Sequence, residues 1–374
     1  MKQGWEIKKL GEVCEILDHL RVPITKKDRR EGCYPYYGAS GVQDYIDSYI
    51  FDGRYLLVGE DGAKWGANDK SAYIIEGKSW VNNHAHILKI NDCLSDKLVE
   101  YYLVAKDLQE FITGAIVPKL TQQALRNIPI PVPPLPVQEQ IVSELDLLSG
   151  IIEKKREQLK ELDTLAQSIF YDMFGDPITN EKGWEVKKLG EVCDDITDGD
   201  HMPPPKSETG IPFLTISDID KEKRELNFND TFFVPQEYYD NLKENRRAKK
   251  GDVLYTVTGS YGIPVIVNTC KHFCFQRHIA LLKPKQENLL SLFLCQWFLC
   301  EGVKFMADQV ATGIAQKTVS LTSIRKFEII LPPLPLQHQF ATKIEAIEKQ
   351  KELIKQSISE TETLFNARMQ EHFG

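Results

Sequence analysis

Apolar and small residues recur at alternating intervals of four and three between Gln138 and about Met173. They occupy positions 141, 145, 148, 152, 159, 162, 166, 169 and 173. Only Lys155 interrupts this 3.5-residue period, which is typical of a helix that packs in a coiled coil. At 1.5 Å per residue, about 36 residues predict a helical rod of roughly 54 Å.

A second stretch carries the same pattern 199 residues later. The sequence Pro-Pro-Leu-Pro precedes the first stretch at 133–136 and the second at 332–335. Apolar residues then stand at 340, 344, 347, 354, 358 and 365, in the same register as in the first stretch. Because both stretches belong to one chain, we predict two long helices that pair with each other as an antiparallel coiled coil.

An eleven-residue sequence at 4–14 also returns, at 183–193, with ten of its eleven positions identical. Both predicted helices close on Phe-Gly, at 174–175 and 373–374. These markers define two copies of one unit, which predicts an internal repeat with pseudo-twofold symmetry. The offset between copies grows from 179 residues at the opening to 199 at the prolines, so the middle regions differ. We therefore expect a fixed frame that carries two different recognition surfaces.

The regions inside the two frames show mixed strand and helix patterns. In the first copy, strands are predicted at 55–58, 71–75 and 86–90 and a helix at 94–111. In the second copy, strands are predicted at 252–257, 263–267 and 278–282 and a helix at 289–306. The predicted fold is α+β, with globular domains at 1–132 and 176–331 and spacer helices at 133–175 and 332–374.

The composition is that of an ordinary soluble globular protein: 374 residues, 42% hydrophobic and 27% charged. Because there is no run of 18 uncharged apolar residues and no signal-peptide core, we expect a cytoplasmic location and no membrane partner. The eight cysteines are irregularly spaced and predict no disulfide framework. The net charge of −8 decides little about nucleic acid, since an acidic chain can still carry a basic face.

Signatures of catalysis and metal binding fail at specific positions. A phosphate-binding loop ending at 77–79 would need glycine where Ala72 stands. The cysteines and histidines within 270–278 have the side chains of a zinc site, but no second pair follows at the right spacing, so ordinary thiols are favoured. We predict no catalytic residue and no metal ligand.

Basic and polar residues on predicted turns fit nucleic-acid contacts, because Arg and Lys neutralise phosphates and amide, hydroxyl and guanidinium groups pair with base edges. For each basic run alone, a solvated loop is the simpler interpretation; the presence of such runs in both copies favours binding. In the first copy the candidates are Lys26, Lys27, Arg29, Arg30, Tyr37, Ser40, Lys64, Trp65, Asn82, Asn83 and His84. In the second copy they are His201, Lys206, Arg246, Arg247, Lys249, Ser260, Tyr261, Arg277, His278 and Lys317.

The repeated frame resembles that of a known family. The opening Gly-Trp-Glu…Leu-Gly-Glu-Val and the Pro-Pro-Leu-Pro-x-Gln-x-Gln helix start resemble those of the specificity subunits of type I restriction-modification systems. The sequences at 36–41, 57–62, 82–86 and 251–254 resemble the same family. The likeness covers essentially the whole chain.

This resemblance implies that each globular domain is a target-recognition domain that reads one half of a bipartite, asymmetric site in double-stranded DNA. It implies that the paired helices set the spacing between the halves and dock two methyltransferase (modification) subunits. Restriction subunits with translocase and nuclease activity would join that core. S-adenosylmethionine, ATP and magnesium would belong to the partners, and this chain would hold no cofactor and perform no catalysis.

Two other classes of protein remain open from the sequence. A self-contained nuclease or methyltransferase would need a catalytic motif, and the sequence shows none that we recognise. A coiled-coil scaffold would bind proteins through its globular domains and show no DNA sequence preference.

Overall fold

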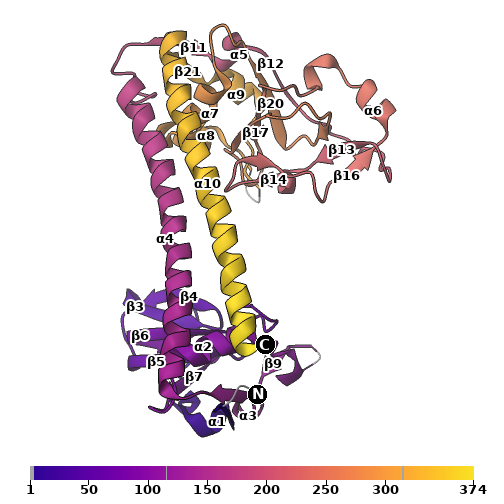
Figure 1. The fold of residues 1–374 in the computed structure, drawn as a ribbon. Helices are drawn as coiled ribbons and strands as arrows, with labels where there is room; N and C mark the ends of the chain where they lie inside the picture. The colour runs from indigo at the N-terminus through magenta and orange to yellow at the C-terminus, as the bar shows by residue number, and fades with distance from the viewer. Residues whose placement is uncertain (1–3, 115, 314–315) are drawn as a thin grey trace. The chain divides into compact units, whose positions relative to one another are not determined.

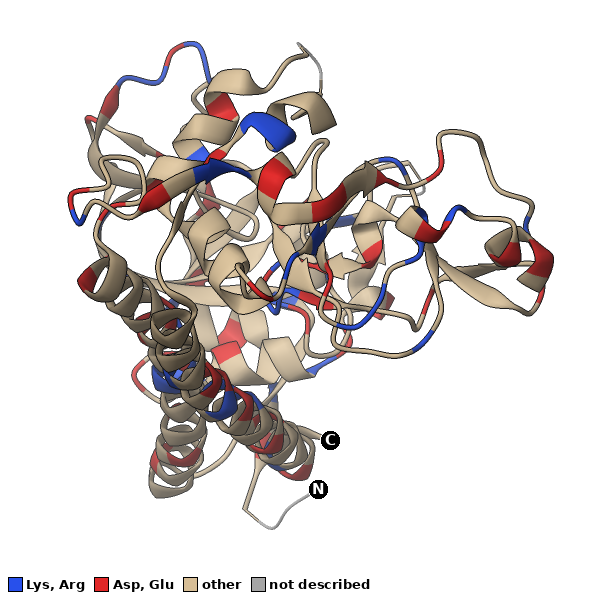
Figure 2. Cartoon of the chain, turned by 90° about the horizontal axis from the view of Figure 1, so that it is seen from above, with Lys and Arg blue, Asp and Glu red and all other residues tan. Residues whose placement is uncertain are grey.

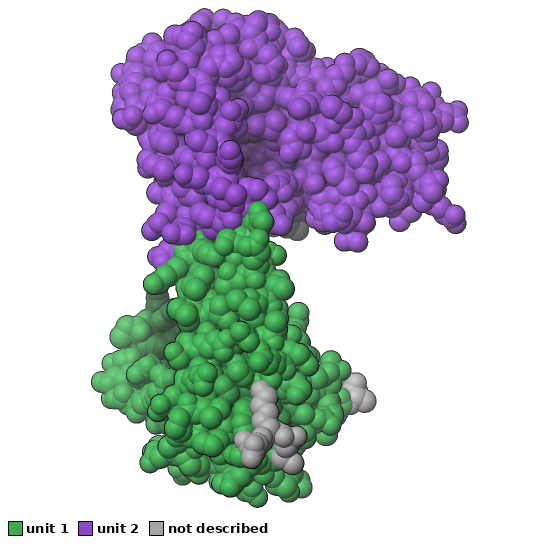
Figure 3. Space-filling view, viewed as in Figure 1, with its two compact units in different colours: residues 1–156, 355–374 green, residues 157–354 purple. Residues whose placement is uncertain are grey.

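The computed structural model describes residues 4–114, 116–313 and 316–374. The chain forms two compact units, Met1–Arg156 with Lys355–Gly374 and Glu157–Ile354 (Figure 3). Each unit contains one globular lobe and part of each long helix. We call the globular parts lobe 1 (residues 4–134) and lobe 2 (residues 175–333). The predicted α+β fold with two long helices is confirmed (Figure 1).

The long helices are α4 (Leu135–Phe174) and α10 (Leu334–Phe373), each of 40 residues. Both begin at the leucine of the repeated proline sequence, where a proline in the first helical turn removes no needed hydrogen bond. Gly175 follows α4 with a φ of +76°, a conformation that favours glycine at a helix end.

The two helices are antiparallel neighbours within each unit. Residues with higher numbers in α4 contact residues with lower numbers in α10. The pairs in the first unit are Glu144–Arg368 (2.9 Å) and Arg156–Glu362 (2.6 Å). In the second unit Asp163 pairs with Lys351 at 3.0 Å, and the rings of Phe170 and Phe340 lie 5.7 Å apart. Lys155, which interrupts the heptad pattern, is held by Ser357 and Thr361.

Lobe 1 is built on a six-stranded sheet with strand order β2-β7-β5-β6-β3-β4, in which β3 runs parallel to β6. The strands are β2 (Cys14–Ile16), β3 (Glu31–Gly38), β4 (Gly41–Ile46), β5 (Phe51–Gly59), β6 (Ala72–Val81) and β7 (Ala85–Ile90). The remaining elements are η1 (Asp18–Leu20), α2 (Asp96–Ala105), η2 (Gln109–Phe111), β8 (Ile112–Thr113), β9 (Lys119–Leu120) and α3 (Gln122–Arg126). The three strands predicted here are present.

The helix predicted at 94–111 is shorter in the structure. Ser95 caps α2 by accepting a hydrogen bond from the Leu98 amide, so the helix starts at Asp96, two residues after the predicted start. It stops at Lys106, whose backbone is extended. Buried Leu108 continues the apolar pattern in the turn that follows, which explains why the sequence suggested a longer helix.

Lobe 2 contains a four-stranded sheet, β12-β20-β17-β18, a three-stranded sheet, β16-β13-β19, and the hairpin β14-β15. The strands are β12 (Cys193–Asp198), β13 (Ile211–Leu214), β14 (Ile219–Asp220), β15 (Glu225–Leu226), β16 (Phe232–Val234), β17 (Val253–Thr256), β18 (Pro264–Ile266), β19 (Cys274–Phe275) and β20 (Ile279–Pro284). The helical elements are η3 (Ile216–Asp218), α6 (Gln236–Asp240), η4 (Glu244–Arg246), α7 (Ser291–Leu299), α8 (Glu301–Val310) and α9 (Leu321–Lys326).

The prediction of one helix at 289–306 was wrong, because the chain forms α7 and α8 with a break at Cys300. The backbone of Cys300 is extended, with a ψ of 137°. The break allows Phe293 and Trp297 of α7 and Val303 of α8 to bury in the same core. No proline marks the break, so the apolar pattern alone predicted a continuous helix.

The repeated opening sequence closes each lobe with the same strand pair. In lobe 1, β1 (Glu6–Lys9) pairs with β10 (Pro129–Val132), the strand that leads into α4. In lobe 2, β11 (Glu185–Lys188) pairs in the same register with β21 (Glu328–Leu331). The short helices α1 (Leu10–Val13) and α5 (Leu189–Val192) follow directly. Both ends of each lobe are therefore tied together beside the start of a long helix.

A buried glutamine fastens each lobe to its long helix. The side chain of Gln138 accepts from the Ser95 amide (2.8 Å) and donates to the carbonyl oxygens of Pro133 (2.8 Å) and Cys93 (3.1 Å). Gln337 makes the corresponding three bonds in lobe 2, to the Leu290 amide and to the carbonyls of Pro332 and Asn288. The first glutamine of the repeated Pro-Pro-Leu-Pro-x-Gln sequence is thus a structural fastener.

Candidate nucleic-acid interface

A backbone corner in lobe 1 brings three separate segments together. The amide of Glu60 donates to the carbonyl of His84, and the amide of Leu120 donates to the carbonyl of Glu60, both at 2.8 Å. Asp61 follows and forms an isolated bridge with β9. Gly62 then turns the chain outward with a φ of +71°.

Lobe 2 repeats this corner. The amide of Val257 donates to the carbonyl of His278, and the amide of Val319 donates to the carbonyl of Val257, both at 2.9 Å. Thr258 follows with an equivalent bridge, and Gly259 turns the chain with a φ of +70°.

The matching bonds establish which residues correspond between the lobes. His84 corresponds to His278, so the histidine is common to both corners. Asp61 corresponds to Thr258, so a carboxylate in lobe 1 stands where lobe 2 has a hydroxyl. A carboxylate only accepts hydrogen bonds, whereas a hydroxyl both donates and accepts. One backbone frame therefore carries different chemistry in each lobe, with Asp61 partly exposed and Thr258 buried.

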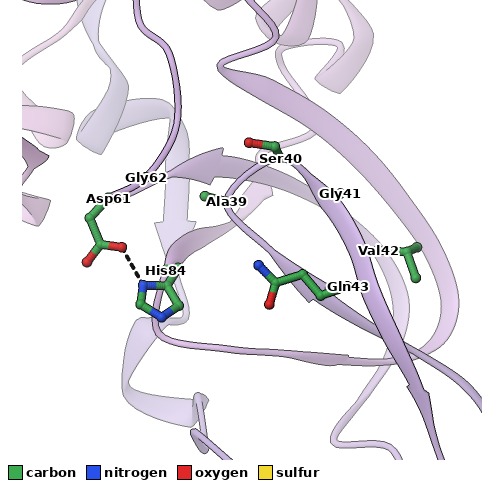
Figure 4. A pocket seen from close by; sticks show the side chains of 8 residues that line it. All are labelled: Ala39, Ser40, Gly41, Val42, Gln43, Asp61, Gly62 and His84. Atoms are coloured by element: carbon green, nitrogen blue, oxygen red, sulfur yellow. Dashed lines mark hydrogen bonds and ion pairs between the residues drawn. The ribbon is translucent and has the colours of Figure 1, made fainter. Parts of the chain in front are cut away.

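Lobe 1 has a surface hollow of about 380 Å³ at this corner (Figure 4). It is lined by Ala39, Ser40, Gly41, Val42, Gln43, Asp61, Gly62 and His84. These residues come from the turn between β3 and β4, from the segment after β5 and from the segment before β7. An ion pair joins Asp61 Oδ1 to His84 Nδ1 on one side of the hollow, and Gln43 lies on the other (Figure 4).

A buried ion network adjoins the hollow through Glu60. Lys119 Nζ lies 2.6 Å from Glu60 Oε1, and the Arg21 guanidinium pairs with both Glu60 and Asp18. His86 Nδ1 lies 2.6 Å from Asp18 Oδ2. Burial opposes ionisation of Glu60, but hydrogen bonds from Lys119 and Arg21 outweigh it and lower the pKa of that carboxyl group.

Asp18 fixes the other end of this network. Its two carboxylate oxygens accept hydrogen bonds from His86, from the Gln122 side chain (3.0 Å) and from the Ile87 amide (3.0 Å). Burial again opposes ionisation, but these hydrogen bonds outweigh it and lower the pKa of Asp18. The network holds the segments before β3 and β7 in fixed positions beside the hollow.

The same network includes a possible ligand set for a metal ion, because one ligand atom each of Asp18, Glu60 and His86 lie within 4.8 Å of one another. Arg21 and Lys119 already supply two positive charges to these carboxylates. His86 Nε2 also faces the carbonyl of Leu120 at 2.7 Å. The donor set is therefore satisfied within the protein and does not fit an added cation.

The zinc alternative at 270–278 does not gain support either. Cys270 is exposed and Cys274 is buried. Burial raises the pKa of the Cys274 thiol to about 12, as expected for a buried thiol in the core. Among the described residues, this segment contributes to no cluster of potential ligands.

Most of the predicted DNA-contacting residues of lobe 1 lie at the surface. The exposed ones are Lys26, Lys27, Arg30, Ser40, Lys64, Asn83 and His84. Ser40 and His84 line the hollow. Over the part of the chain that the structure describes, the side chains of Lys27, Arg30 and Lys64 form no hydrogen bond or ion pair and remain available to phosphate.

Arg29 and Tyr37 are tied into the β3–β4 hairpin. The Arg29 guanidinium lies 3.2 Å from Asp44 Oδ2 and 4.1 Å from the centroid of the Tyr36 ring. Tyr37 is half-buried, and burial raises the pKa of its hydroxyl.

Trp65 and Asn82 turn inward, although the sequence placed them on exposed turns. The Trp65 indole is 8% exposed and donates to the carbonyl of Gly59 at 3.0 Å. Asn82 is 2% exposed, donates to Gln43 Oε1 (3.2 Å) and accepts from the His84 amide (2.8 Å). These two residues support the hollow from inside the lobe.

In lobe 2, the predicted residues His201, Lys206, Lys249, Ser260, Arg277 and Lys317 are exposed, and Arg246, Arg247, Tyr261 and His278 are half-buried. Basic residues are interspersed with acidic ones along the chain (Figure 2). Seven of these predicted residues fall into three local groups.

The first group surrounds the loop after β12. The Asp200 amide donates to the carbonyl of Phe275, and the Arg277 amide donates to the carbonyl of Asp200, both at 3.1 Å. Arg246 Nη1 lies 3.3 Å from Asp200 Oδ1. Gly199 permits this approach, since a Cβ there would lie 1.8 Å from the Phe275 oxygen. The structure thus brings Arg246 and Arg277, far apart in sequence, to one loop, which also carries His201.

The second group, Arg247 and Lys249, is engaged within the lobe. The Arg247 guanidinium carbon lies 5.2 Å from the Tyr239 ring centroid, and Lys249 Nζ lies 2.6 Å from Glu244 Oε1. The third group lies at the Gly259 corner, where the backbone carbonyl of Lys317 accepts a hydrogen bond from the Gly259 amide. The Ser260 hydroxyl accepts a hydrogen bond from Lys221 Nζ at 2.6 Å.

Three other predicted residues of lobe 2 have clear local environments. Tyr261 donates to Asp308 Oδ1 at 2.5 Å. Burial lowers the pKa of His278, and the positive charge of Arg277 lowers it further. Lys206 Nζ lies 5.1 Å from the Phe232 ring centroid, a cation–π distance.

Sequence reasoning missed Gln43 and Asp61 of the hollow and Lys221 beside Ser260. Asp61 precedes a glycine on a turn, which is a visible signal for an exposed polar group. Gln43 gave no signal, because its position depends on how the β3–β4 hairpin folds against Asn82.

Two chemically distinct lobes on one repeated frame of paired helices define a protein with two separate recognition domains. Residues 2–162 and 181–363 match the family described as the type I restriction modification DNA specificity domain. The chain belongs to this family.

Individual relatives agree with the assignment. One is the Haemophilus influenzae protein S.HindORF215P, whose name places it among type I restriction enzyme specificity subunits; identity is 28%, over 92% of this chain and 87% of the relative. The MjaVIII specificity subunit of Methanocaldococcus jannaschii is 22% identical, over 92% of this chain and 86% of the relative. The crystal structure of the type I restriction-modification S subunit from M. genitalium shares the fold, with a TM-score of 0.57 and 13% identity. The match covers 99% of this chain and 96% of that structure's chain.

The described residues contain no helix that is both long enough and apolar enough to cross a membrane.

Proposed function

We propose that this chain is the DNA-recognition subunit of a type I restriction-modification complex and that each lobe reads one half of a bipartite, asymmetric sequence. The observation that carries the proposal is the pair of equivalent corners, in which Asp61 of lobe 1 is replaced by Thr258 in lobe 2. Different groups at equivalent positions read different bases, because each base pair presents its own donors and acceptors in the major groove.

The recognition domains would span 1–132 and 176–331, with spacer helices at 133–175 and 332–374. Exposed Lys26, Lys27, Arg30 and Lys64 in lobe 1 supply phosphate contacts, which position a protein on DNA without reading its sequence. Arg277 and Lys317 supply them in lobe 2.

The partners would be double-stranded DNA, two methyltransferase subunits and the restriction subunits. The relatives carry the name of specificity subunits of type I restriction enzymes, which supports assembly with such subunits. Two copies of one helical frame offer two similar docking surfaces, one for each methyltransferase. S-adenosylmethionine, ATP and magnesium would be held by the partners.

We infer a non-catalytic role for this chain, and the chemistry of the hollow supports it. Its one carboxylate–histidine pair, Asp61 with His84, lacks an adjacent nucleophile in a fixed geometry, since the nearby Ser40 is an exposed turn residue. In lobe 2 the carboxylate of that pair is absent at the corresponding corner. We therefore assign both corners to recognition.

The test is a map of methylated bases in DNA from cells that express this chain with a cognate modification subunit. We expect a split motif with a gap of fixed length. Exchange of lobe 1 for that of a relative should change one half of the motif and leave the other intact. Methylation without a split motif, or cleavage or methyl transfer by the purified chain alone, would contradict the proposal.

A further inference from the structure

The hollow of lobe 1 holds two polar side chains in fixed orientations, Asp61 and Gln43, which face the space from opposite sides (Figure 4). We propose that this pair reads a base with an exocyclic amino group, adenine or cytosine, at one position of the half-site bound by lobe 1. The proposal rests on the proposed function and specifies the chemistry of one of its reading sites.

Asp61 supplies a hydrogen-bond acceptor. Its Oδ1 atom is paired with His84 Nδ1, which fixes the carboxylate plane. Its Oδ2 atom has no hydrogen-bond partner among the described residues. The Asp61 side chain is 21% exposed and lines the hollow, so the carboxylate is accessible to a hydrogen-bond donor.

Gln43 supplies a hydrogen-bond donor. Its Oε1 atom accepts from Asn82 Nδ2 at 3.2 Å, and Asn82 is itself fixed because its Oδ1 accepts from the His84 amide. This chain of bonds determines which end of the Gln43 amide is oxygen and leaves Nε2 to donate. Gly38 makes room for the amide, since a Cβ there would lie 2.1 Å from Gln43 Nε2.

An acceptor and a donor that face the same hollow select among the bases. In the major groove, adenine N6 and cytosine N4 donate hydrogen bonds, whereas guanine O6 and thymine O4 only accept. A carboxylate attracts the first pair and repels the second. Adenine also offers N7 as an acceptor for the Gln43 amide. The strength of such a contact corresponds to about 5- to 150-fold discrimination against the wrong base.

Lobe 2 lacks this combination at the equivalent corner. Thr258 occupies the position of Asp61, and its hydroxyl accepts from the Thr318 hydroxyl at 3.3 Å. The proposal therefore concerns only the corner of lobe 1.

The experiment measures binding of the assembled modification complex to duplexes that carry each of the four base pairs at each half-site position. Asp61→Asn keeps the shape but replaces one acceptor oxygen with a donor. We expect one position in the lobe 1 half-site to lose at least about 5-fold of its preference for adenine or cytosine. The other half-site and the gap should stay unchanged.

A second variant, Gln43→Leu, removes the donor without adding charge and should weaken discrimination at the same position. Thr258→Ala in lobe 2 is the matched control and should leave the lobe 1 half-site unaltered. The inference is overturned if both lobe 1 variants retain the full preference, or if they weaken binding equally for all bases. In those cases a split motif would still stand and only the role of this hollow would fail.

Discussion

At the residue scale, the structure separates side chains that face solvent from side chains that support them. Lys27 and Arg30 are exposed on a loop, whereas Arg29 between them in the chain is held by Asp44. In the same way, Glu60 is tied to Lys119, whereas the next residue, Asp61, faces the hollow. Neighbouring residues of the same chemical type thus have different roles.

The ion network of Asp18 and Glu60 predicts how lobe 1 responds to acid. Both carboxyl groups have folded-state pKa values below their ordinary values near 4, so the folded state binds protons less readily than the unfolded chain. Their contribution to stability is therefore full above the ordinary pKa and is lost as the pH falls through the lowered values. Urea unfolding of lobe 1, followed at a series of pH values from about 6 down to 3, should show this loss.

Glu60→Gln isolates this effect. The variant leaves Lys119 without its carboxylate and leaves Arg21 with Asp18 alone, and it should lower the free energy of unfolding by about 3 kcal/mol at neutral pH. Its stability should also fall less steeply in acid than that of the unmodified chain. An unchanged pH dependence would show that ionisation of Glu60 does not contribute to the stability of the folded state.

The sequence alone predicts that the lysines of lobe 1 lie at the surface, but it does not predict the hollow. Runs of Lys and Arg on turns are visible without a fold, and Lys26, Lys27 and Lys64 are indeed exposed. Trp65 and Asn82 lie on turns as well, yet they are buried because their polar atoms find partners inside the lobe. Such partners come from distant segments, which local patterns do not reveal. Whether the predicted residues touch DNA stays a prediction.

At the element scale, the long helices were the most predictable part of the chain, because an apolar period that repeats over many turns leaves few alternatives. The lobes were less predictable. The helix at 289–306 breaks at Cys300 with no proline to mark it, and the parallel pairing of β3 with β6 joins segments that share no local signal.

The glutamine fasteners give a prediction at this scale. Gln138→Ala should lower the free energy of unfolding of its unit by about 2–3 kcal/mol, because it leaves buried backbone groups of Ser95 and Pro133 without partners. Gln337→Ala should have the same effect in the other unit. Chemical denaturation measures both. Gln140 and Gln339 lie two residues further on and are exposed, so their alanine variants are matched controls with changes within about 0.5 kcal/mol. Equal effects at buried and exposed glutamines would contradict the fastener role.

At the scale of the whole molecule, each lobe meets a helix pair that is continuous over 40 residues. Polar residues interrupt the apolar seam near its middle, where Lys155 bonds to Ser357 and Lys351 to Asp163. Buried polar pairs of this kind favour one helix register over others, since a shifted register leaves a charge unpaired. A fixed register is what a spacer of defined length requires.

Insertion of one heptad into each helix, after Arg156 and after Ile354, tests the spacer. Seven residues add about 10 Å, or about three base pairs of DNA, so the gap in the methylated motif should lengthen by about three. Both half-sites should keep their sequences. Insertion into only one helix disrupts the pairing and should abolish methylation. A gap that keeps its length after the double insertion would contradict a ruler made of these helices.

The closed strand pairs, β1 with β10 and β11 with β21, have a consequence for how such proteins diversify. Because each lobe is sealed by its own pair and fastened by its own glutamine, a foreign lobe that enters between these boundaries meets the same frame. Recombination at the two repeated sequences can then exchange one lobe without disturbing the other. A lineage that holds n lobes thereby has access to n² ordered pairs, so the number of distinct specificities grows as the square of the number of inherited parts.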